Sequence, residues 1–223
     1  MQSGVARGES MNAAPAVKIC GLTRAVDARA AAAAGAELAG VIFAPGRRTV
    51  DASHAALILA DLSLTRVGVF VDAEPDVLLD VALSASLRVL QLHGDESPSY
   101  ISAVRDRWDG KIWKALRPRH PDDFLRGVDL FGSLVDGLLL DGWSADARGG
   151  TGTSFPWERL APVRSALPSA VSLIVAGGLT PENVGTAIEL LRPDIVDVSS
   201  GVESAPGVKD PGAIDRFITA ARQ

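Results

Sequence analysis

The stretch that decides the fold is Val171–Leu191, VSLIVAGGLTPENVGTAIELL. Its first six residues form an apolar, β-branched run that is typical of a strand covered on both faces. Two glycines follow, and Thr180 and Pro181 then open a helical stretch as its N-cap and first helical residue. The stretch therefore predicts a strand followed by a helix, which is one unit of a parallel β/α structure.

The same unit recurs along the chain, because short apolar runs alternate eight times with helical stretches. Alternation of this kind means parallel pairing through βαβ crossovers, and eight units match a closed barrel of about 200–250 residues. We expect an α/β fold, a single-domain (β/α)8 TIM barrel over residues 17–223, with a doubly wound open sheet as the alternative. The predicted strands are Val17–Cys20, Leu38–Phe43, Arg66–Val71, Arg88–Leu92, Lys111–Leu116, Gly137–Asp141, Val171–Ala176 and Asp194–Ser199. The predicted helices are Thr23–Ala34, Asp51–Leu62, Pro75–Leu83, Ser97–Trp108, Pro121–Phe131, Pro156–Leu167, Thr180–Leu191 and Pro211–Arg222.

Composition narrows the class of protein. The chain has 223 residues, of which 47% are hydrophobic, so global disorder is excluded. Its 22 basic and 27 acidic residues give a net charge of −5, which provides no general attraction for nucleic acid or an anionic membrane. The single cysteine, Cys20, rules out an internal disulfide and a cysteine-rich zinc site. No apolar run is long enough for a membrane span, and residues 1–16 lack the apolar core of a secretory signal. We expect a cytoplasmic protein with a flexible leader over residues 1–16.

Two reactive side chains end predicted strands, where the active site of a barrel lies. Cys20 ends the first strand, before a helix whose dipole would favour a thiolate, although a buried core cysteine is the alternative. Asp141 ends the run LLLD, where loss of solvent would raise its pKa and suit a general acid, although a turn aspartate is the alternative. The sequence thus predicts a thiol and a carboxyl group at the same end of the barrel.

Further polar side chains follow the second and fourth strands. Arg47 and Arg48 lie in a Pro/Gly loop and suit a carboxylate or phosphate, with a solvated surface pair as the alternative. Gln91 and His93 share one face of the fourth strand, and His93 could orient a substrate hydroxyl or act as an acid or base. A histidine with ordinary polar partners is the alternative for His93.

Glycine-rich loops predict a phosphate site. Barrels often bind phosphate with the loops after strands seven and eight, and the seventh loop here runs into a capped helix whose N–H groups and dipole favour an anion. The loop around Gly150 has bare backbone N–H groups that could lie alongside, but it lacks the Lys-Ser/Thr ending of a nucleotide P-loop. The candidate phosphate-binding residues are Gly150, Gly177, Gly178, Ser199, Ser200 and Gly201.

These parts point to one kind of chemistry. The sequence has neither a metal-binding constellation nor a Rossmann-type GxGxxG with a downstream acidic residue, so we expect no metal and no cofactor. A thiolate can remove a proton next to an imine carbon, and a carboxylic acid can protonate a leaving ring oxygen. The combination favours proton transfer on a phosphorylated sugar.

Six ordered motifs resemble the phosphoribosylanthranilate isomerase family over about residues 17–219. They are KICGLT from Lys18, QLHGDE from Gln91, the LLLD run that ends at Asp141, GGTG from Gly149, AGGL from Ala176 and SSGVE from Ser199 with its continuation PGVKD. The resemblance implies a (β/α)8 barrel that acts in tryptophan biosynthesis. The implied reaction is the Amadori rearrangement of N-(5-phosphoribosyl)anthranilate to 1-(2-carboxyphenylamino)-1-deoxyribulose 5-phosphate.

The resemblance also implies roles for individual residues. Asp141 matches the general acid that opens the furanose ring, and Cys20 matches the general base that takes the proton from C2′. Arg48 matches the arginine near the anthranilate carboxylate and ring, with Arg47 as the alternative. Gln91 and His93 are expected in the substrate pocket. Phe155-Pro156-Trp157 and Thr153 depart from the family's usual residues, which affects loop detail more than chemistry.

Two other functions compete with this interpretation. One is another phosphosugar barrel, such as an epimerase of ribulose 5-phosphate, which generally needs a metal or paired aspartates. The other is a non-catalytic barrel that binds an aminated phosphosugar or a partner protein. The expected partner is a small phosphosugar, with no nucleic acid and no membrane, and the expected assembly is a monomer or homodimer.

Overall fold

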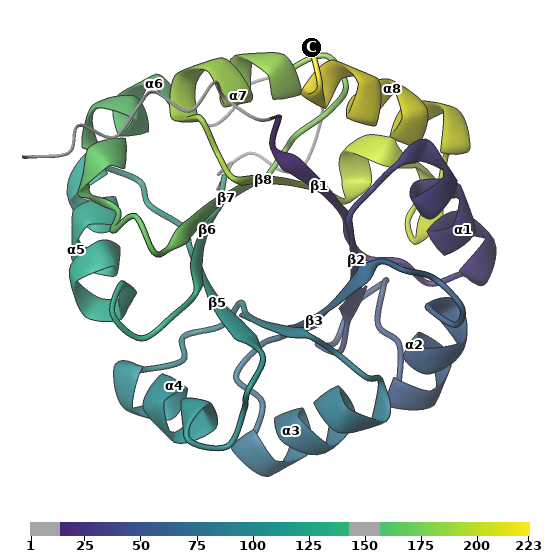
Figure 1. Cartoon of the computed structure of the whole chain (residues 1–223), viewed down its shortest axis with the longest axis horizontal. Helices are drawn as coiled ribbons and strands as arrows, with labels where there is room; N and C mark the ends of the chain where they lie inside the picture. Colours follow the sequence, from purple (N-terminus) through teal and green to yellow (C-terminus); the bar gives the residue numbers. More distant parts are fainter. Residues whose placement is uncertain (1–13, 143–156) are drawn as a thin grey trace, which may run out of the picture.

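The structure of the chain, a computed structural model, describes residues 14–142 and 157–223 and contains the predicted closed barrel. Eight parallel strands pair in sequence order, and the first strand pairs with the eighth, with Val17 opposite Val196, which excludes an open sheet (Figure 1). The strands are β1 Ala16–Ile19, β2 Leu38–Ile42, β3 Thr65–Phe70, β4 Val89–Leu92, β5 Lys111–Leu116, β6 Gly137–Asp141, β7 Ser172–Ala176 and β8 Ile195–Val198.

Helices surround the strands as an outer ring (Figure 1). Several start and stop signals of the sequence are confirmed: the side chains of Asp51 and Ser97 cap helices, and Gly35 ends a helix in the left-handed conformation. Asp210, which was not predicted as a cap, also caps a helix. The helices are α1 Ala25–Ala34, α2 Ala52–Ile58, α3 Pro75–Ser84, α4 Pro98–Arg105, α5 Pro121–Phe131, α6 Trp157–Leu160, α7 Val184–Leu191 and α8 Pro211–Ala221.

Four helices differ from their predictions by more than two residues. α2 ends at Ile58 instead of Leu62, and α4 ends at Arg105 instead of Trp108. The other two differ in kind or in their start.

The continuous helix expected up to Leu167 is a short α6 followed by a 3-10 helix, η1 Ala161–Ala166, because Pro162 has no N–H with which to continue the α-helical ladder. Thr180 does not cap α7, which starts at Val184. The Thr180 hydroxyl accepts a hydrogen bond from the Glu182 N–H, and the Asn183 side chain accepts one from the Thr180 N–H. A turn therefore precedes the helix.

A short hairpin after β8 was not predicted. A 3-10 turn, η2 Ser200–Val202, leads into β9 Glu203–Ala205, which pairs antiparallel with β10 Val208–Lys209. At the other end of the chain, β1 starts at Ala16 and Pro15 is buried, so the barrel includes residues slightly before residue 17. Residues 1–13 lie outside the described residues, and the expected leader stays a prediction.

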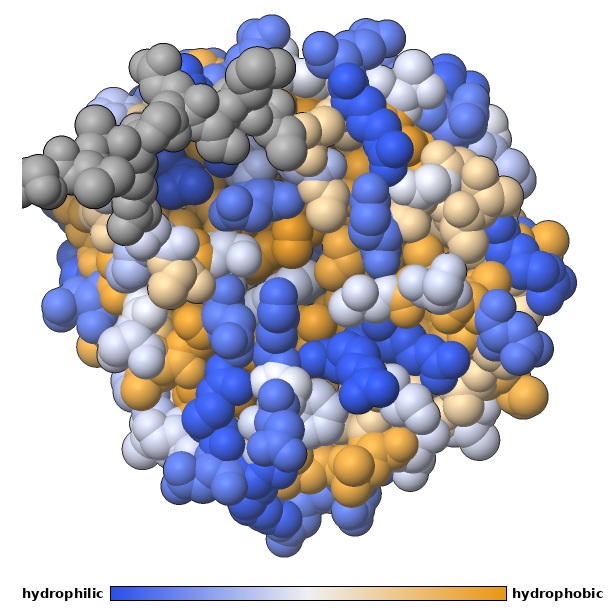
Figure 2. All heavy atoms as spheres, in the orientation of Figure 1, coloured by the Kyte–Doolittle hydropathy of each residue, from blue (hydrophilic) through white to orange (hydrophobic). Residues whose placement is uncertain are grey.

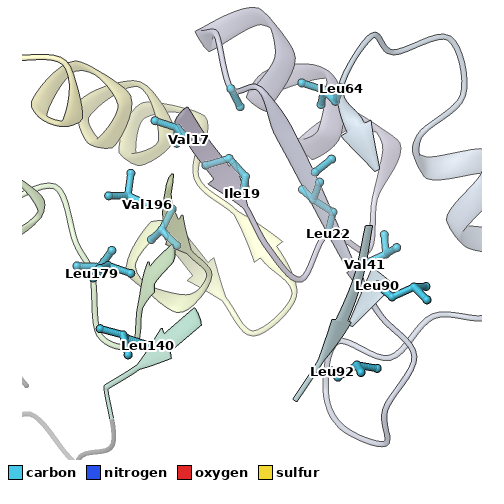
Figure 3. Close-up of a cluster of buried hydrophobic side chains, with 14 of the residues drawn as sticks. Val17, Ile19, Leu22, Val41, Leu64, Leu90, Leu92, Leu140, Leu179 and Val196 are labelled. Atoms are coloured by element: carbon cyan, nitrogen blue, oxygen red, sulfur yellow. The ribbon is translucent and has the colours of Figure 1, made fainter. Parts of the chain in front are cut away.

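The core has two parts. The larger part lies between the strands and the helices, and Figure 3 shows side chains of this layer, including Val17, Ile19 and Val196. The smaller part fills the barrel interior with Leu38, Val67, Val89, Trp113, Ala115, Leu139, Ile174, Ala176 and Ile195. On the face shown in Figure 2, hydrophilic and hydrophobic side chains are interspersed. No helix in the described parts of the chain is long and apolar enough to cross a membrane.

The character of the barrel interior changes along its axis. Side chains two residues apart in a strand face the same side, so the interior can be followed in steps of two. Val89 on β4 and Ile195 on β8 belong to the apolar layer near the amino ends of the strands. Two residues further on, Gln91 and Asp197 are buried polar residues, as is Lys18 on β1. The strands thus carry polar groups toward the carboxyl end of the barrel.

Candidate active site

A cavity of about 380 Å³ lies at the carboxyl end of the barrel. It brings together side chains that follow β1, β2, β4, β6, β7 and β8. Among its lining residues are Cys20, Arg48, Gln91, His93, Asp141, Gly177, Gly178, Ser199 and Ser200, all predicted from the sequence, and Asp197, which was not. Most predicted site residues therefore share one cavity.

Cys20 directly follows β1 and is 7% exposed. A Cβ atom at Gly40 on β2 would lie 2.8 Å from its Sγ, so the bare glycine leaves room for the thiol inside the barrel. Burial raises the pKa of the thiol, and the Lys18 ammonium acts against this increase without reversing it. The expectation that a helix dipole favours the thiolate is therefore wrong for the free protein, since burial dominates.

Asp141 ends β6 and contacts His93. The Nε2 atom of His93 lies 3.0 Å from Asp141 Oδ2, and the Arg117 Nε lies 3.6 Å from the same oxygen. Burial acts to raise the pKa of Asp141, but the hydrogen bond with His93 and the charge of Arg117 outweigh it and lower the pKa. The expected rise in the Asp141 pKa is therefore wrong for the ligand-free site, because the hydrogen bond with His93 and the charge of Arg117 outweigh burial.

Arg48 reaches the cavity from the loop after β2. Its Nε and Nη2 atoms each donate to Glu203, at 2.7 Å, and the Lys209 Nζ donates to the same carboxylate at 2.8 Å. Burial acts to raise the pKa of Glu203, but the hydrogen bonds from Arg48 and Lys209 outweigh it and lower the pKa to about 2. Arg47 is exposed and does not line the cavity, so the geometry favours Arg48 of the two.

The loops after β7 and β8 meet beside this cavity. Gly177 and Gly178 have φ angles of 78° and 73°, which other residues rarely adopt, and nothing lies within 4 Å of the Cβ position of Gly178. Gly201 is pressed against the β7 loop, since a Cβ there would lie 1.9 Å from the Leu179 carbonyl oxygen. These loops leave backbone exposed to the cavity, as an anion site requires. The predicted Gly150 lies outside the described residues.

Sequence reasoning missed Lys18, Arg117, Asp197, Glu203 and Lys209. Lys18 and Asp197 form a buried ion pair with 2.7 Å between Nζ and Oδ2. They were detectable, because each is a charged residue at an inward position of an otherwise apolar strand. Glu203 and Lys209 depend on the unpredicted β9–β10 hairpin. No group of three or more His, Cys, Asp or Glu side chains that could hold a metal occurs in residues 14–142 and 157–223.

Comparisons with known proteins agree on one family. The sequence model described as N-(5'phosphoribosyl)anthranilate (PRA) isomerase matches residues 17–220. N-(5'-phosphoribosyl)anthranilate isomerases from Cellvibrio japonicus and Thiobacillus denitrificans are 43% and 44% identical to this chain, covering 93% and 92% of it and 93% and 97% of their own lengths.

Solved structures show the same relationship. A crystal structure of phosphoribosyl anthranilate isomerase from Thermotoga maritima has a TM-score of 0.84 and 37% identity, over 93% of this chain and 98% of its own. Another phosphoribosyl anthranilate isomerase, solved in complex with reduced 1-(o-carboxyphenylamino)-1-deoxyribulose 5-phosphate, has a TM-score of 0.81 and 35% identity over the same shares.

The fold, the site and these relatives together define a (β/α)8-barrel isomerase. The chain belongs to the N-(5'-phosphoribosyl)anthranilate isomerase family, and its activity is an isomerisation in tryptophan biosynthesis. The family that the six sequence motifs resemble is thereby confirmed. What remains is to assign the chemistry to individual residues.

Proposed function

We propose that Asp141 is the general acid and Cys20 the general base in the rearrangement of N-(5-phosphoribosyl)anthranilate. Asp141 gives a proton to the furanose ring oxygen. The bond from that oxygen to C1′ breaks, its electron pair stays on the oxygen, and the nitrogen lone pair forms an iminium bond to C1′. Cys20, as a thiolate that has released its own proton to solvent, then takes the proton from C2′, and the released electrons neutralise the iminium as an enolamine. The enolamine tautomerises to the ketone, which completes the isomerisation.

The observation that carries the proposal is the shared cavity. Cys20 and Asp141 come from opposite parts of the chain, yet both line the 380 Å³ cavity together with glycine-rich loops. A general acid and base must reach the same substrate, and geometry is the first requirement for such a role. The cavity meets that requirement with one group of each kind.

The charges of the substrate adjust both groups in the required direction. The substrate carries a carboxylate and a phosphate, and negative charge close to Asp141 raises the pKa of its carboxyl group and favours the protonated acid. Ring opening then creates a positively charged iminium, which lowers the pKa of the nearby Cys20 thiol. The acid step therefore prepares the base step, and the two occur in that order.

The remaining residues hold the substrate. We assign Arg48 to the anthranilate carboxylate, because its guanidinium lines the cavity and suits planar recognition of carboxylates. His93 contacts Asp141 and lies beside the sugar. We assign the phosphate to the loops after β7 and β8, with Gly177, Gly178, Ser199, Ser200 and Gly201.

Two further expectations accompany this function. We propose that the enzyme works in the cytoplasm, which its net charge of −5 and single cysteine favour. We also propose a monomer or homodimer, given that the relative from Thermotoga maritima is described as dimeric and has been solved as monomers. Neither arrangement affects the chemistry within one barrel.

The test follows the fluorescence of freshly made phosphoribosylanthranilate, which decays as the isomerase consumes it. We expect Cys20→Ala and Asp141→Asn each to lower kcat by about 10²–10⁴-fold, the usual contribution of a general acid or base. Asp215→Asn, on the exposed face of α8, is the control and should keep the rate of the unaltered protein. If Cys20→Ala turns over substrate at the unaltered rate, the assignment is wrong.

A further inference from the structure

A chain of hydrogen bonds runs through the carboxyl end of the barrel, and Asp197, Gln91, His93 and Asp141 in it also line the cavity. Asp197 Oδ2 accepts from the Lys18 Nζ at 2.7 Å, and Lys18 also donates to the Gln91 Oε1 at 2.9 Å. The Gln91 Nε2 lies 2.9 Å from the His93 Nδ1, and the His93 Nε2 lies 3.0 Å from the Asp141 Oδ2. Every member up to Gln91 is buried, so these groups depend on one another for hydrogen bonds.

The chemistry of Lys18 sets the direction of this chain. An ammonium group has three donors and no acceptor, so the Gln91 atom that faces it must be the amide oxygen. The Gln91 amide nitrogen is then the atom that meets His93, and it can only donate. His93 Nδ1 must accept, which leaves the ring proton of neutral His93 on Nε2, facing Asp141.

The charge on Lys18 is itself secured by its surroundings. Burial acts to lower the pKa of Lys18, but the charge of Asp197 and the hydrogen bonds with Asp197 and Cys20 outweigh it and raise the pKa. Lys18 thus stays an ammonium while Asp197 is ionised, and its orientation of Gln91 is fixed. The amide group of a glutamine in water rotates freely, whereas the Gln91 amide is held by Lys18 at its oxygen and by His93 at its nitrogen.

We propose that Lys18 and Gln91 are positioning residues that hold neutral His93 as the Nε2–H tautomer and thereby direct the acid proton of Asp141 toward the substrate. This rests on the proposed role of Asp141. With Nε2–H donating to Oδ2, the Asp141 proton belongs on Oδ1, which lies against the β7 loop, 2.8 Å from the Cβ position of Gly177. In the other tautomer, the bare Nε2 would accept the Asp141 proton and withdraw it from the ring oxygen.

The inference gives Gln91 a role different from substrate binding. Gln91 lines the cavity, but its amide oxygen and nitrogen already bind Lys18 and His93. Its effect on the reaction therefore passes through His93. A substitution at Gln91 should change kcat more than KM, because the substrate contacts themselves remain in place.

The first experiment observes the tautomer directly by long-range ¹H–¹⁵N NMR of the full chain with labelled histidine. The chain has three histidines, and His54→Gln with His120→Gln leaves only the His93 signals. We expect the unaltered residue to show a protonated Nε2 and an unprotonated Nδ1. A proton on Nδ1 of neutral His93 would overturn the inference without any further variant.

The second experiment changes the donor to His93. Gln91→Glu keeps the shape but cannot donate, so Nδ1 should become protonated and kcat should fall by about 10–100-fold, as for loss of a group that orients a functional histidine. Gln91→Met removes both hydrogen bonds and should also lose the single tautomer. KM should change by less than about threefold in both, on the reasoning for substitutions that affect only the chemical step.

The outcomes separate this inference from the proposed function. If Gln91→Glu and Gln91→Met keep the Nε2–H signal and the unaltered kcat while Cys20→Ala and Asp141→Asn are inactive, the positioning role is wrong and the acid–base assignment stands. If Asp141→Asn is fully active, the proposed function itself fails. Gln91→Met introduces no buried charge, so it tests the positioning role in place of Gln91→Glu if that variant does not fold.

Discussion

The two ends of the barrel carry cavities that differ in size and in chemistry. The cavity at the amino ends of the strands measures about 880 Å³, against about 380 Å³ at the carboxyl end. The larger one is lined by apolar residues of the barrel interior, such as Val89 and Trp113, and by charged residues at its rim, such as Arg88 and Lys111, which are exposed. The smaller one is lined by a thiol, an imidazole and carboxyl groups.

The difference shows that convergence of polar groups, and not volume, marks the site of chemistry. At the amino end, charged side chains extend into water, and the neighbouring side chains in the barrel interior are apolar. At the carboxyl end, Lys18, Gln91 and Asp197 are buried and bind one another, an arrangement that costs free energy unless every partner is present. We therefore expect substitutions at the amino end to change stability alone and those at the carboxyl end to change turnover or substrate affinity, with or without a change in stability.

The largest expected effect is on stability at the amino end. Trp108 is 9% exposed, lines the larger cavity and donates its indole N–H to the Lys111 carbonyl. Trp108→Ala should lower the free energy of unfolding by about 3–5 kcal/mol, the usual cost of truncating a buried aromatic residue. Urea unfolding measures the loss, and kcat per folded molecule should not change.

Trp108→Phe is the matched control, since it keeps an aromatic ring and should lose less stability. If folded Trp108→Ala lost kcat to an extent comparable with Asp141→Asn, the expected separation of the two ends of the barrel, stability at one and turnover at the other, would be wrong.

A smaller effect is expected for substrate affinity at the carboxyl end. Arg48→Met should raise KM by about 10–100-fold, since a hydrogen bond to a charged group contributes roughly 1.5–3 kcal/mol. Arg47→Met is the matched control, because Arg47 is exposed and lies outside the cavity. Steady-state kinetics on both variants tests the choice between the adjacent arginines, and a larger rise in KM for Arg47→Met would reverse it.

The barrel fold was predictable because its strands and helices have local sequence signals. The apolar runs and the caps at Asp51 and Ser97 place most elements within one or two residues. That Cys20 and Asp141 share a cavity was predictable because strand ends in a barrel meet at one rim. Local pattern and global topology thus supported the same assignment.

The electrostatics of the site were not predictable, because they depend on partners far apart in sequence. Arg48 and Glu203 are 155 residues apart, and they meet only through the short hairpin after β8. The lowered pKa of Asp141 depends on the placement of His93 and Arg117. Neither the contact of Arg48 with Glu203 nor the approach of His93 and Arg117 to Asp141 follows from residue type or periodicity.

The smallest expected effect concerns pH. Because the pKa of Glu203 is lowered from 4.5 to about 2, its ionised form stabilises the fold above pH 4.5, and this stabilisation is lost as the pH falls toward 2. Glu203→Gln should therefore be less stable than the unaltered protein at neutral pH, and the difference should shrink in that acid range. Urea unfolding across the range measures it, with Glu189→Gln on the exposed face of α7 as control. A difference independent of pH would contradict the role of the Glu203 charge.

The pairing of β1 with β8 has a consequence beyond the placement of the site. Every strand of the barrel has a hydrogen-bonded neighbour on each side, so the barrel offers no unpaired strand backbone onto which a strand from another molecule could add. The same closure that brings Cys20 and Asp141 into one cavity protects the eight barrel strands against edge-to-edge aggregation.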